Sequence, residues 1–368
     1  MTEQPLVSVV TPVYNGEPYL AECIESVLAQ SYPKWEYVLV NNCSKDSTLE
    51  TMQRYADRDP RIRVFDNTEF MSQFQNWNHA MRLISPESKY CKVIHADDWI
   101  YPECIAEMVA LAEEAPSVGV VGAYRLTEGK VDLDSVPCDK PRRTTVVSGR
   151  ELGRSIMLGM IPPFGSPTSL LIRSDIVRAK DPFYDESIVH ADAEVCYALL
   201  QETDFGFVHR VLTFTRMHEA SITSRTERFR TGRLANFAFL VRYGPVYLSP
   251  AEYKARLRSV RGKYHRFLAQ SVYENKGKAF WQFHRTELAK LNQPIHRPTL
   301  VAFALLELLD LRQTWRRWRN ARRENRKEGD YAASFGAAIG SIVSSGENED
   351  VRPAASGTEA GPAESPAA

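Results

Sequence analysis

The sequence predicts an α/β protein, with a mostly parallel sheet flanked by helices and a C-terminal helical extension. Strand-like and helix-like runs alternate over the first half of the chain, which is the pattern of a doubly wound sheet. Polar clusters follow the first, second and fourth strand-like runs, at the strand ends where such sheets bind ligands. From about residue 229 the pattern becomes mainly helical.

Five strands are predicted from short β-branched runs. These runs lack the alternation of a half-exposed strand, so we expect them to be buried on both faces. They are LVSVVTPVY (6–14), WEYVLVNN (35–42), IRVFDN (62–67), YCKVIHA (90–96) and VGVVGAYRL (118–126).

The helices between these strands are predicted from their apolar faces and capping signals. They are YLAECIESVLAQS (19–31), SKDSTLETMQRYADRD (44–59), SQFQNWNHAMRLI (72–84) and PECIAEMVALAEEA (102–115). Residues 130–175 are Pro-rich and less regular. A helix over 191–202 and a strand over 205–218 are expected to follow and to return the chain to the sheet.

Length and composition predict a globular protein in three parts. The 368 residues are divided into a first domain (1–225), a helical region (226–330) and a disordered tail (331–368). Lys+Arg and Asp+Glu both number 46, so no nucleic-acid partner is expected. Six scattered cysteines indicate reduced thiols, and the N-terminus lacks a signal peptide. We therefore expect a cytoplasmic protein, with a peripheral place on the inner face of the cell membrane.

Two adjacent carboxylates follow the fourth predicted strand, in KVIHADDWIYP (92–102). Asp97 and Asp98 repel each other, so the pair is favourable only where water or a cation neutralises it. The residues alone leave both interpretations open: an exposed turn, or a site for a divalent cation.

Five motifs in order resemble family 2 glycosyltransferases, which have the Rossmann-like GT-A fold. They are VSVVTPVYNGEPYLAECIESVLAQSY, EYVLVNNCSKDST, KVIHADDWIYPE, HADAEVC and TRMHEASI, and they span roughly residues 6–225. The resemblance implies an inverting enzyme that moves a sugar from a nucleotide-diphosphate sugar to a hydroxyl acceptor. It also implies Mg²⁺ or Mn²⁺ as cofactor and a role in cell-surface polysaccharide or glycolipid synthesis, with a glycan or lipid-linked acceptor.

The same resemblance implies roles for individual residues. The catalytic base is expected to be Asp192, which deprotonates the incoming hydroxyl. For the nucleotide-sugar the implied residues are Pro12, Tyr14, Asn15, Asn42, Asn78, Asp97 and Arg216. For the metal they are Asp97, Asp98 and His218. Arg216 and His218 are two residues apart, so on a strand both would face the same side.

The sequence departs from the family pattern at Asn41, Asn42, His95 and Ala191, where the family commonly has acidic residues. An amide can still pair with a base edge, and an imidazole at position 95 can bind metal, bind ribose or pack. Structural alternatives also stay open: Asp192 as a helix cap, Asn42 in a capped loop and Asn78 on a helix surface. Glu194 is a second acidic candidate beside Asp192.

Three further hypotheses compete or add to this one. A degenerate GT-A domain would bind a sugar-nucleotide or a partner without catalysis. A sugar nucleotidyltransferase would need a Gly-rich first loop with Arg and Lys, which TPVYNGEPYL does not supply. The basic, Trp-containing helix predicted over 312–327 fits a membrane surface, or else is a solvated charged face.

Overall fold

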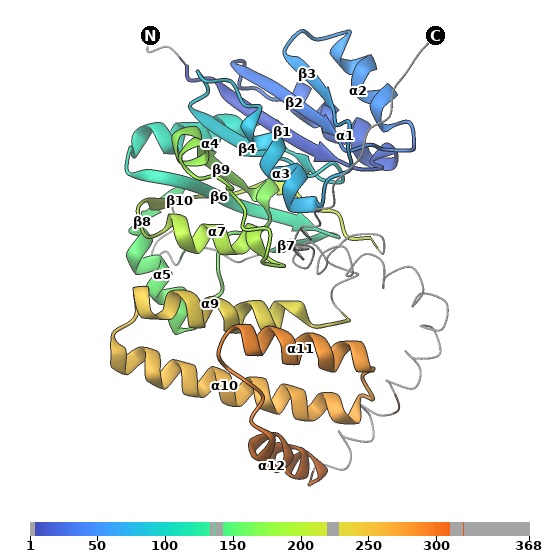
Figure 1. Ribbon diagram of the computed structural model, residues 1–368. Helices are drawn as coiled ribbons and strands as arrows, with labels where there is room; N and C mark the ends of the chain where they lie inside the picture. Colours follow the sequence, from blue (N-terminus) through green and yellow to red (C-terminus); the bar gives the residue numbers. More distant parts are fainter. Residues whose placement is uncertain (1–3, 133–135, 137–142, 219–227, 310–318, 320–368) are drawn as a thin grey trace, which may run out of the picture. The chain divides into compact units, whose positions relative to one another are not determined.

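The computed structural model describes residues 4–132, 136, 143–218, 228–309 and 319, and these form a mixed α/β sheet structure followed by helices (Figure 1). The sheet has ten strands, and its main path has the order β3-β2-β1-β4-β9-β6-β10-β5, with β7 beside β6 and β8 beside β10. The strands are β1 (Val7–Val13), β2 (Trp35–Asn41), β3 (Ile62–Asp66), β4 (Tyr90–Val93), β5 (Trp99–Ile100), β6 (Val118–Thr127), β7 (Lys130–Asp132), β8 (Thr144–Val147), β9 (Leu170–Arg173) and β10 (Asp204–Phe214).

Helices cover both faces of this sheet. In the first part they are α1 (Glu17–Leu28), α2 (Thr48–Ala56), α3 (Gln73–Arg82), α4 (Cys104–Glu114), α5 (Gly149–Leu158), the 3-10 turn η1 (Pro167–Ser169), α6 (Ser174–Ala179) and α7 (Ala191–Leu199). The C-terminal part contains α9 (Thr231–Tyr247), α10 (Pro250–Tyr273), α11 (Lys278–Lys290) and α12 (Arg297–Leu308). The predicted alternation and the C-terminal helical pattern are therefore confirmed.

The central strands are buried on both faces, as the lack of alternation predicted. All seven residues of β1 and of β2 are buried. Successive residues of β2 belong to different hydrophobic clusters: Val38 and Val40 pack with α3, α5 and α7, and Tyr37 and Leu39 with α1, α2 and α4. The sheet thus lies between two helical layers. These layers cover its faces but not the ends of its strands, and the strand ends are called the open edge here.

One strand of the sheet was not predicted. β9 runs antiparallel between β4 and β6, so the sheet is mixed at its centre. β9 is only four residues long and follows a Pro-rich stretch, so it carries no clear periodic signal. The stretch of 130–175 also contains β7, β8, α5 and η1, although its sequence appeared irregular.

The C-terminal helices pack on the first part through α9. Tyr243 and Tyr247 belong to the same hydrophobic core as the strand residues Val38 and Phe205. The hydroxyl of Tyr247 donates to the carbonyl oxygen of Tyr197 at 2.6 Å. The domain boundary at residue 225 stays a prediction, and both the 312–327 helix and the 331–368 tail lie outside the described residues, apart from Arg319.

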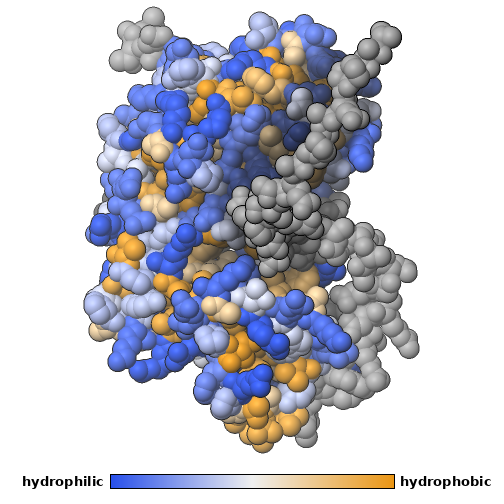
Figure 2. All heavy atoms as spheres, in the orientation of Figure 1, coloured by the Kyte–Doolittle hydropathy of each residue, from blue (hydrophilic) through white to orange (hydrophobic). Residues whose placement is uncertain are grey.

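Hydrophilic residues cover most of the visible face, whereas hydrophobic residues gather at its lower end, over α12 (Figure 2). In the described part of the chain, every helix is too short or too polar to cross a membrane. The five described cysteines are free thiols, as expected, and four of them are buried. Burial raises the pKa of Cys23 and of Cys91 to about 12, so both thiols stay protonated.

A buried glutamate on β2 ties the N-terminal strands together, and it yields a stability prediction. Glu36 is 9% exposed and accepts hydrogen bonds from Ser8, Ser85 and Arg63. Burial by itself would raise the pKa of Glu36, but these hydrogen bonds outweigh it and lower the pKa below its ordinary value. The ionised form is therefore favoured in the folded protein, and it stabilises the fold above the unfolded pKa.

We expect Glu36→Gln to lower the free energy of unfolding at neutral pH by about 1–3 kcal/mol, because a charge-assisted acceptor is lost. This deficit should shrink as the pH falls through the folded pKa of Glu36, where the wild type loses the same contribution. Urea unfolding at acidic and neutral pH measures the deficit in free energy and its dependence on pH, with the exposed Glu50→Gln as control. A deficit that is independent of pH would show that packing, and not charge, is responsible.

Candidate functional site

The loops after β1 and β2 are held together at the open edge of the sheet. The backbone N–H of Asn15 donates to Ser44 Oγ at 2.9 Å, and the Asn15 side-chain oxygen accepts from Lys45 N at 2.9 Å. Asn15 has a φ of 51°, a left-handed conformation that asparagine tolerates well. The loops that follow these two neighbouring parallel strands are therefore in direct contact.

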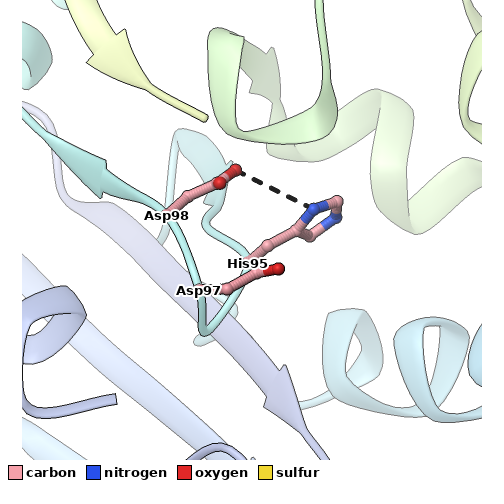
Figure 3. A group of neighbouring side chains, drawn as sticks. All are labelled: His95, Asp97 and Asp98. Atoms are coloured by element: carbon pink, nitrogen blue, oxygen red, sulfur yellow. Dashed lines mark ion pairs between the residues drawn. The ribbon is translucent and has the colours of Figure 1, made fainter. Parts of the chain in front are cut away.

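The acidic pair lies in the loop after β4, together with His95 (Figure 3). His95, Asp97 and Asp98 each have one atom that could bind a metal, and these three atoms lie within 4.8 Å of one another. Asp98 is 2% exposed and accepts from Thr168 Oγ1 at 2.6 Å and from the N–H of Arg216 at 3.0 Å. Burial raises its pKa above the ordinary value. Asp97 is the more open of the two, with a side chain 32% exposed.

Arg216 and His218 both contact Asp97. The Arg216 Nε donates to the Asp97 carbonyl oxygen at 3.0 Å, and His218 Nε2 lies 3.0 Å from Asp97 Oδ2. The Arg216 guanidinium also pairs with Glu22 and stacks 4.6 Å from the centre of the Tyr19 ring. β10 ends at Phe214, so Arg216 and His218 lie after the strand and not in it, although both contact Asp97.

His95 has a buried atom without a partner. Its ring packs against Trp77 with 4.6 Å between ring centres, and its backbone N–H donates to Thr168 Oγ1 at 3.1 Å. His95 Nδ1 is 4.0 Å from Asp98, whereas Nε2 has no hydrogen-bond partner among the described residues. A buried polar atom without a partner is costly, so this nitrogen is suited to a ligand.

A buried lysine fixes the turn that holds this loop. Lys92 of β4 is fully buried, and its ammonium donates to the carbonyl oxygens of Thr168 and Leu170. Burial lowers the pKa of Lys92. Because Thr168 contacts both His95 and Asp98, Lys92 positions the acidic loop through η1. The sequence analysis did not predict the contact between Lys92 and η1, although a lysine inside an apolar strand run was a visible signal.

Two exposed aromatic rings stand beside the first loop. Tyr14 is 46% exposed and Phe70 is 62% exposed, and their rings meet edge to face with 5.0 Å between centres. Large exposed rings in contact are unusual on a surface that binds nothing. Phe70 was not predicted, because it precedes α3 by three residues and its approach to Tyr14 is a tertiary contact.

Two predicted nucleotide residues contact the backbone of neighbouring loops, and their role in nucleotide binding stays a prediction. Asn42 accepts from the N–H of Met71 at 2.9 Å and donates to its carbonyl oxygen at 2.8 Å. Asn78 makes the same two-way contact with the backbone of Tyr184, at 2.8 and 2.9 Å. Both side chains are buried, so their amides brace loops rather than present a free edge to a base. Pro12 is likewise buried within β1, opposite Val40.

Asp192 lies in the first turn of α7 with its carboxylate open. His190 is the N-cap residue of this helix, and no side-chain cap is formed. Within the described residues the Asp192 carboxylate has no hydrogen bond or ion pair, so the capping alternative is not supported. Glu194 differs: it is 4% exposed and is paired with Tyr243 and Arg242 of α9.

Comparison with known proteins identifies the first part of the chain. Residues 8–178 match the model of glycosyl transferase family 2. This stretch of the chain is therefore a family 2 glycosyltransferase domain. TuaG of Bacillus subtilis, a glycosyltransferase named for teichuronic acid biosynthesis, is 30% identical to this chain over 132 residues, which are 36% of this chain and 52% of TuaG. An uncharacterized Sinorhizobium fredii protein, y4gI, is 35% identical over 137 residues, or 37% of this chain and 14% of its own length. The chain thus spans about half or less of these relatives.

Solved structures show the same fold. The structure of S. aureus TarS residues 1–349 in complex with UDP-GlcNAc is similar with a TM-score of 0.58, at 17% identity, and the match covers 88% of this chain and 93% of that chain. The GT-A fold expected from the sequence is therefore confirmed, and the matched region includes the C-terminal helices as well as the family 2 domain.

Proposed function

We propose that this protein transfers a sugar from a nucleoside-diphosphate sugar to a hydroxyl acceptor, with inversion at the anomeric carbon. The observation that carries this proposal is the cluster of His95, Asp97 and Asp98, with His218 beside Asp97, next to the strand ends of a family 2 domain. The name of TuaG supports a glycan or lipid-linked acceptor in cell-surface polysaccharide or glycolipid synthesis.

The cluster has the chemistry to hold a divalent cation. Asp97 offers an open carboxylate, His218 Nε2 lies beside it, and the His95 Nε2 atom is buried without a partner. Carboxylate oxygens suit Mg²⁺ and Mn²⁺, and imidazole nitrogens favour Mn²⁺ of these two. Such a cation neutralises the charge on a departing diphosphate. Asp98 supports the site mainly by joining Thr168 and Arg216 around the loop.

The nucleotide is proposed to enter beside the first loop. The exposed rings of Tyr14 and Phe70 provide flat surfaces for a nucleobase, and the loop that carries Asn15 is held in place by its contacts to Ser44 and Lys45. Arg216 contributes positive charge near the diphosphate end of such a ligand, although Glu22 offsets part of it.

Asp192 is proposed as the general base. It would take the proton from the acceptor hydroxyl as that oxygen forms its bond to the anomeric carbon, while the bond from this carbon to the diphosphate oxygen breaks. Attack opposite the leaving group gives inversion. The open Asp192 carboxylate is available for this role, whereas the Glu194 carboxylate is committed to α9.

The competing function is a domain that binds sugar-nucleotides without catalysis. Asn41, Asn42, His95 and Ala191 favour it, because they replace acidic residues of the family pattern. Calorimetric titration of UDP, GDP and dTDP, with Mn²⁺ and with a chelator, tests whether a nucleotide binds at all. Metal-dependent binding, followed by product formation with inverted anomeric configuration, supports the enzyme. Binding without turnover for any donor and acceptor supports the binding domain.

The aromatic pair gives a separate prediction for nucleotide affinity. Phe70→Ala is expected to raise the Kd of the preferred nucleotide about 5- to 100-fold, because stacking of a base on an aromatic ring contributes roughly 1–3 kcal/mol. Phe70 is largely exposed, so the thermal stability should be unchanged. Tyr14→Phe keeps its ring and serves as the matched control. Equal affinity of Phe70→Ala and wild type would place the base elsewhere.

A further inference from the structure

The last described helix, α12, buries a glutamate against α10 and leaves a row of aliphatic side chains exposed. Glu307 is 5% exposed and is the only buried residue of this helix. It accepts from Arg266 at 2.7 Å and from Gln270 at 3.1 Å, both on α10. The contact to α10 also includes a hydrogen bond from the Tyr273 hydroxyl to the Ala304 carbonyl oxygen, at 2.7 Å. The inner face of α12 thus combines Glu307 with half-buried Leu300, Phe303 and Ala304, while further aliphatic side chains face outward.

The outward face of α12 is defined here as its apolar stripe. At 3.6 residues per turn, these side chains fall within an arc of about 160°. Their exposed fractions are high for aliphatic side chains, and Figure 2 shows the corresponding hydrophobic patch. The stripe consists of Val301 (56% exposed), Ala302, Leu305 (60%), Leu306 (57%), Leu308 (41%) and Leu309 (81%).

The C-terminal helical region that carries this stripe has an excess of positive charge. Residues 250–309, which form α10 to α12, contain eleven Lys and Arg against four Glu, although the whole chain has no net charge. Outside the described residues, the sequence of 312–327 adds eight Lys and Arg, one Glu and two tryptophans. An exposed apolar stripe in a region of net positive charge matches a partner that is both apolar and anionic.

We propose that the apolar stripe of α12 docks on an anionic lipid surface, with the helix parallel to the membrane plane. The helix is about 18 Å long at 1.5 Å per residue, too short to span a hydrocarbon layer of about 30 Å. Self-association through the stripe would bring two positively charged regions together, which is unfavourable. A membrane instead supplies acyl chains for the leucines and headgroup charges for the lysines and arginines.

Co-sedimentation of the full chain with vesicles tests this proposal. Vesicles of phosphatidylcholine alone are compared with vesicles that also contain phosphatidylglycerol, at low and high salt. We expect binding to the anionic vesicles that weakens with salt, and a loss of about tenfold or more in the triple variant Leu305→Gln, Leu306→Gln, Leu309→Gln. Ile161→Gln removes an equally exposed aliphatic side chain (63%) from a different segment and should bind as the wild type does.

Three results would overturn the proposal. The wild type could fail to bind anionic vesicles, or the triple variant could bind as tightly as the wild type. A triple variant that changes the size of the protein in solution would instead show that the stripe is an interface between copies. Nucleotide binding by the triple variant is measured in parallel, because it reports on the donor site independently of the membrane. Normal nucleotide binding with lost vesicle binding is the expected pair of results.

Discussion

Replacing Asp97 with asparagine is expected to lower the rate of sugar transfer by roughly 10³-fold, because a neutral amide cannot balance the charge of a divalent cation and a diphosphate. The protein should stay folded. The Asp97 side chain is 32% exposed, and the oxygen of an amide can still accept from the His218 ring at the distance of 3.0 Å seen here. The effect should therefore appear in catalysis and in metal-dependent nucleotide binding, and not in the melting temperature.

The neighbouring Asp98 gives a contrast that tests this assignment. Its carboxylate accepts from Thr168 and from the N–H of Arg216 while almost fully buried, so Asp98→Asn places an NH₂ group against one of two donors. An unsatisfied buried donor costs about 1–3 kcal/mol, and the melting temperature should fall together with the activity.

Initial rates, calorimetry and thermal melts are compared for the wild type, Asp97→Asn, Asp98→Asn and the exposed control Asp57→Asn. A folded Asp97→Asn protein that keeps more than about a tenth of the rate would be inconsistent with metal-assisted departure of the diphosphate. An Asp97→Asn protein that binds nucleotide as the wild type does, in a manner still sensitive to chelator, would move the cation site to other residues.

The sequence was sufficient for the strands and for the acidic loop because both depend on local signals. The unbroken β-branched runs of β1 and β2 require burial on both faces, and the structure has them inside the sheet, between β3 and β4. Asp97 and His218 are 121 residues apart, and only the family pattern connects them. The conflict between Lys92 and its apolar surroundings was visible, but its partners are carbonyl groups of η1 and β9, an element with no clear sequence signal.

The side chains of Asn42 and Asn78 show which contacts a sequence motif leaves out at individual positions. Asn42 occupies a position where the family commonly has an acidic residue that binds the base, and an amide can pair with a base edge in principle. In this protein the same donor and acceptor pair with the backbone of Met71, which comes from a loop 29 residues away. Asn42 therefore makes the loop contacts of the capped-loop alternative. Asn78 likewise pairs with the backbone N–H and carbonyl oxygen of Tyr184. Such competition depends on tertiary contacts that a motif does not contain.

Asp192→Asn is expected to lower kcat by roughly 10²–10⁴-fold and to leave donor binding unchanged, because a general base acts on the acceptor hydroxyl and does not hold the nucleotide. This separation distinguishes the base from Asp97, for which binding and rate should fall together. The first turn of α7 tolerates the change: the carboxylate has no hydrogen bond to lose within the described residues, and the helix has no side-chain cap.

Glu194→Gln is the matched control for the Asp192 variant, since it lies on the same helix two residues later. Its carboxylate joins α7 to Tyr243 and Arg242 of α9, so its loss should reduce the stability while kcat changes much less. Rates with saturating donor and acceptor, nucleotide affinity and thermal melts are measured for both variants. An Asp192→Asn protein with normal kcat would exclude this base. If Asp97→Asn is inactive in the same assay, the metal site is still required for transfer. The group that takes the proton must then be sought on another element near the acidic loop.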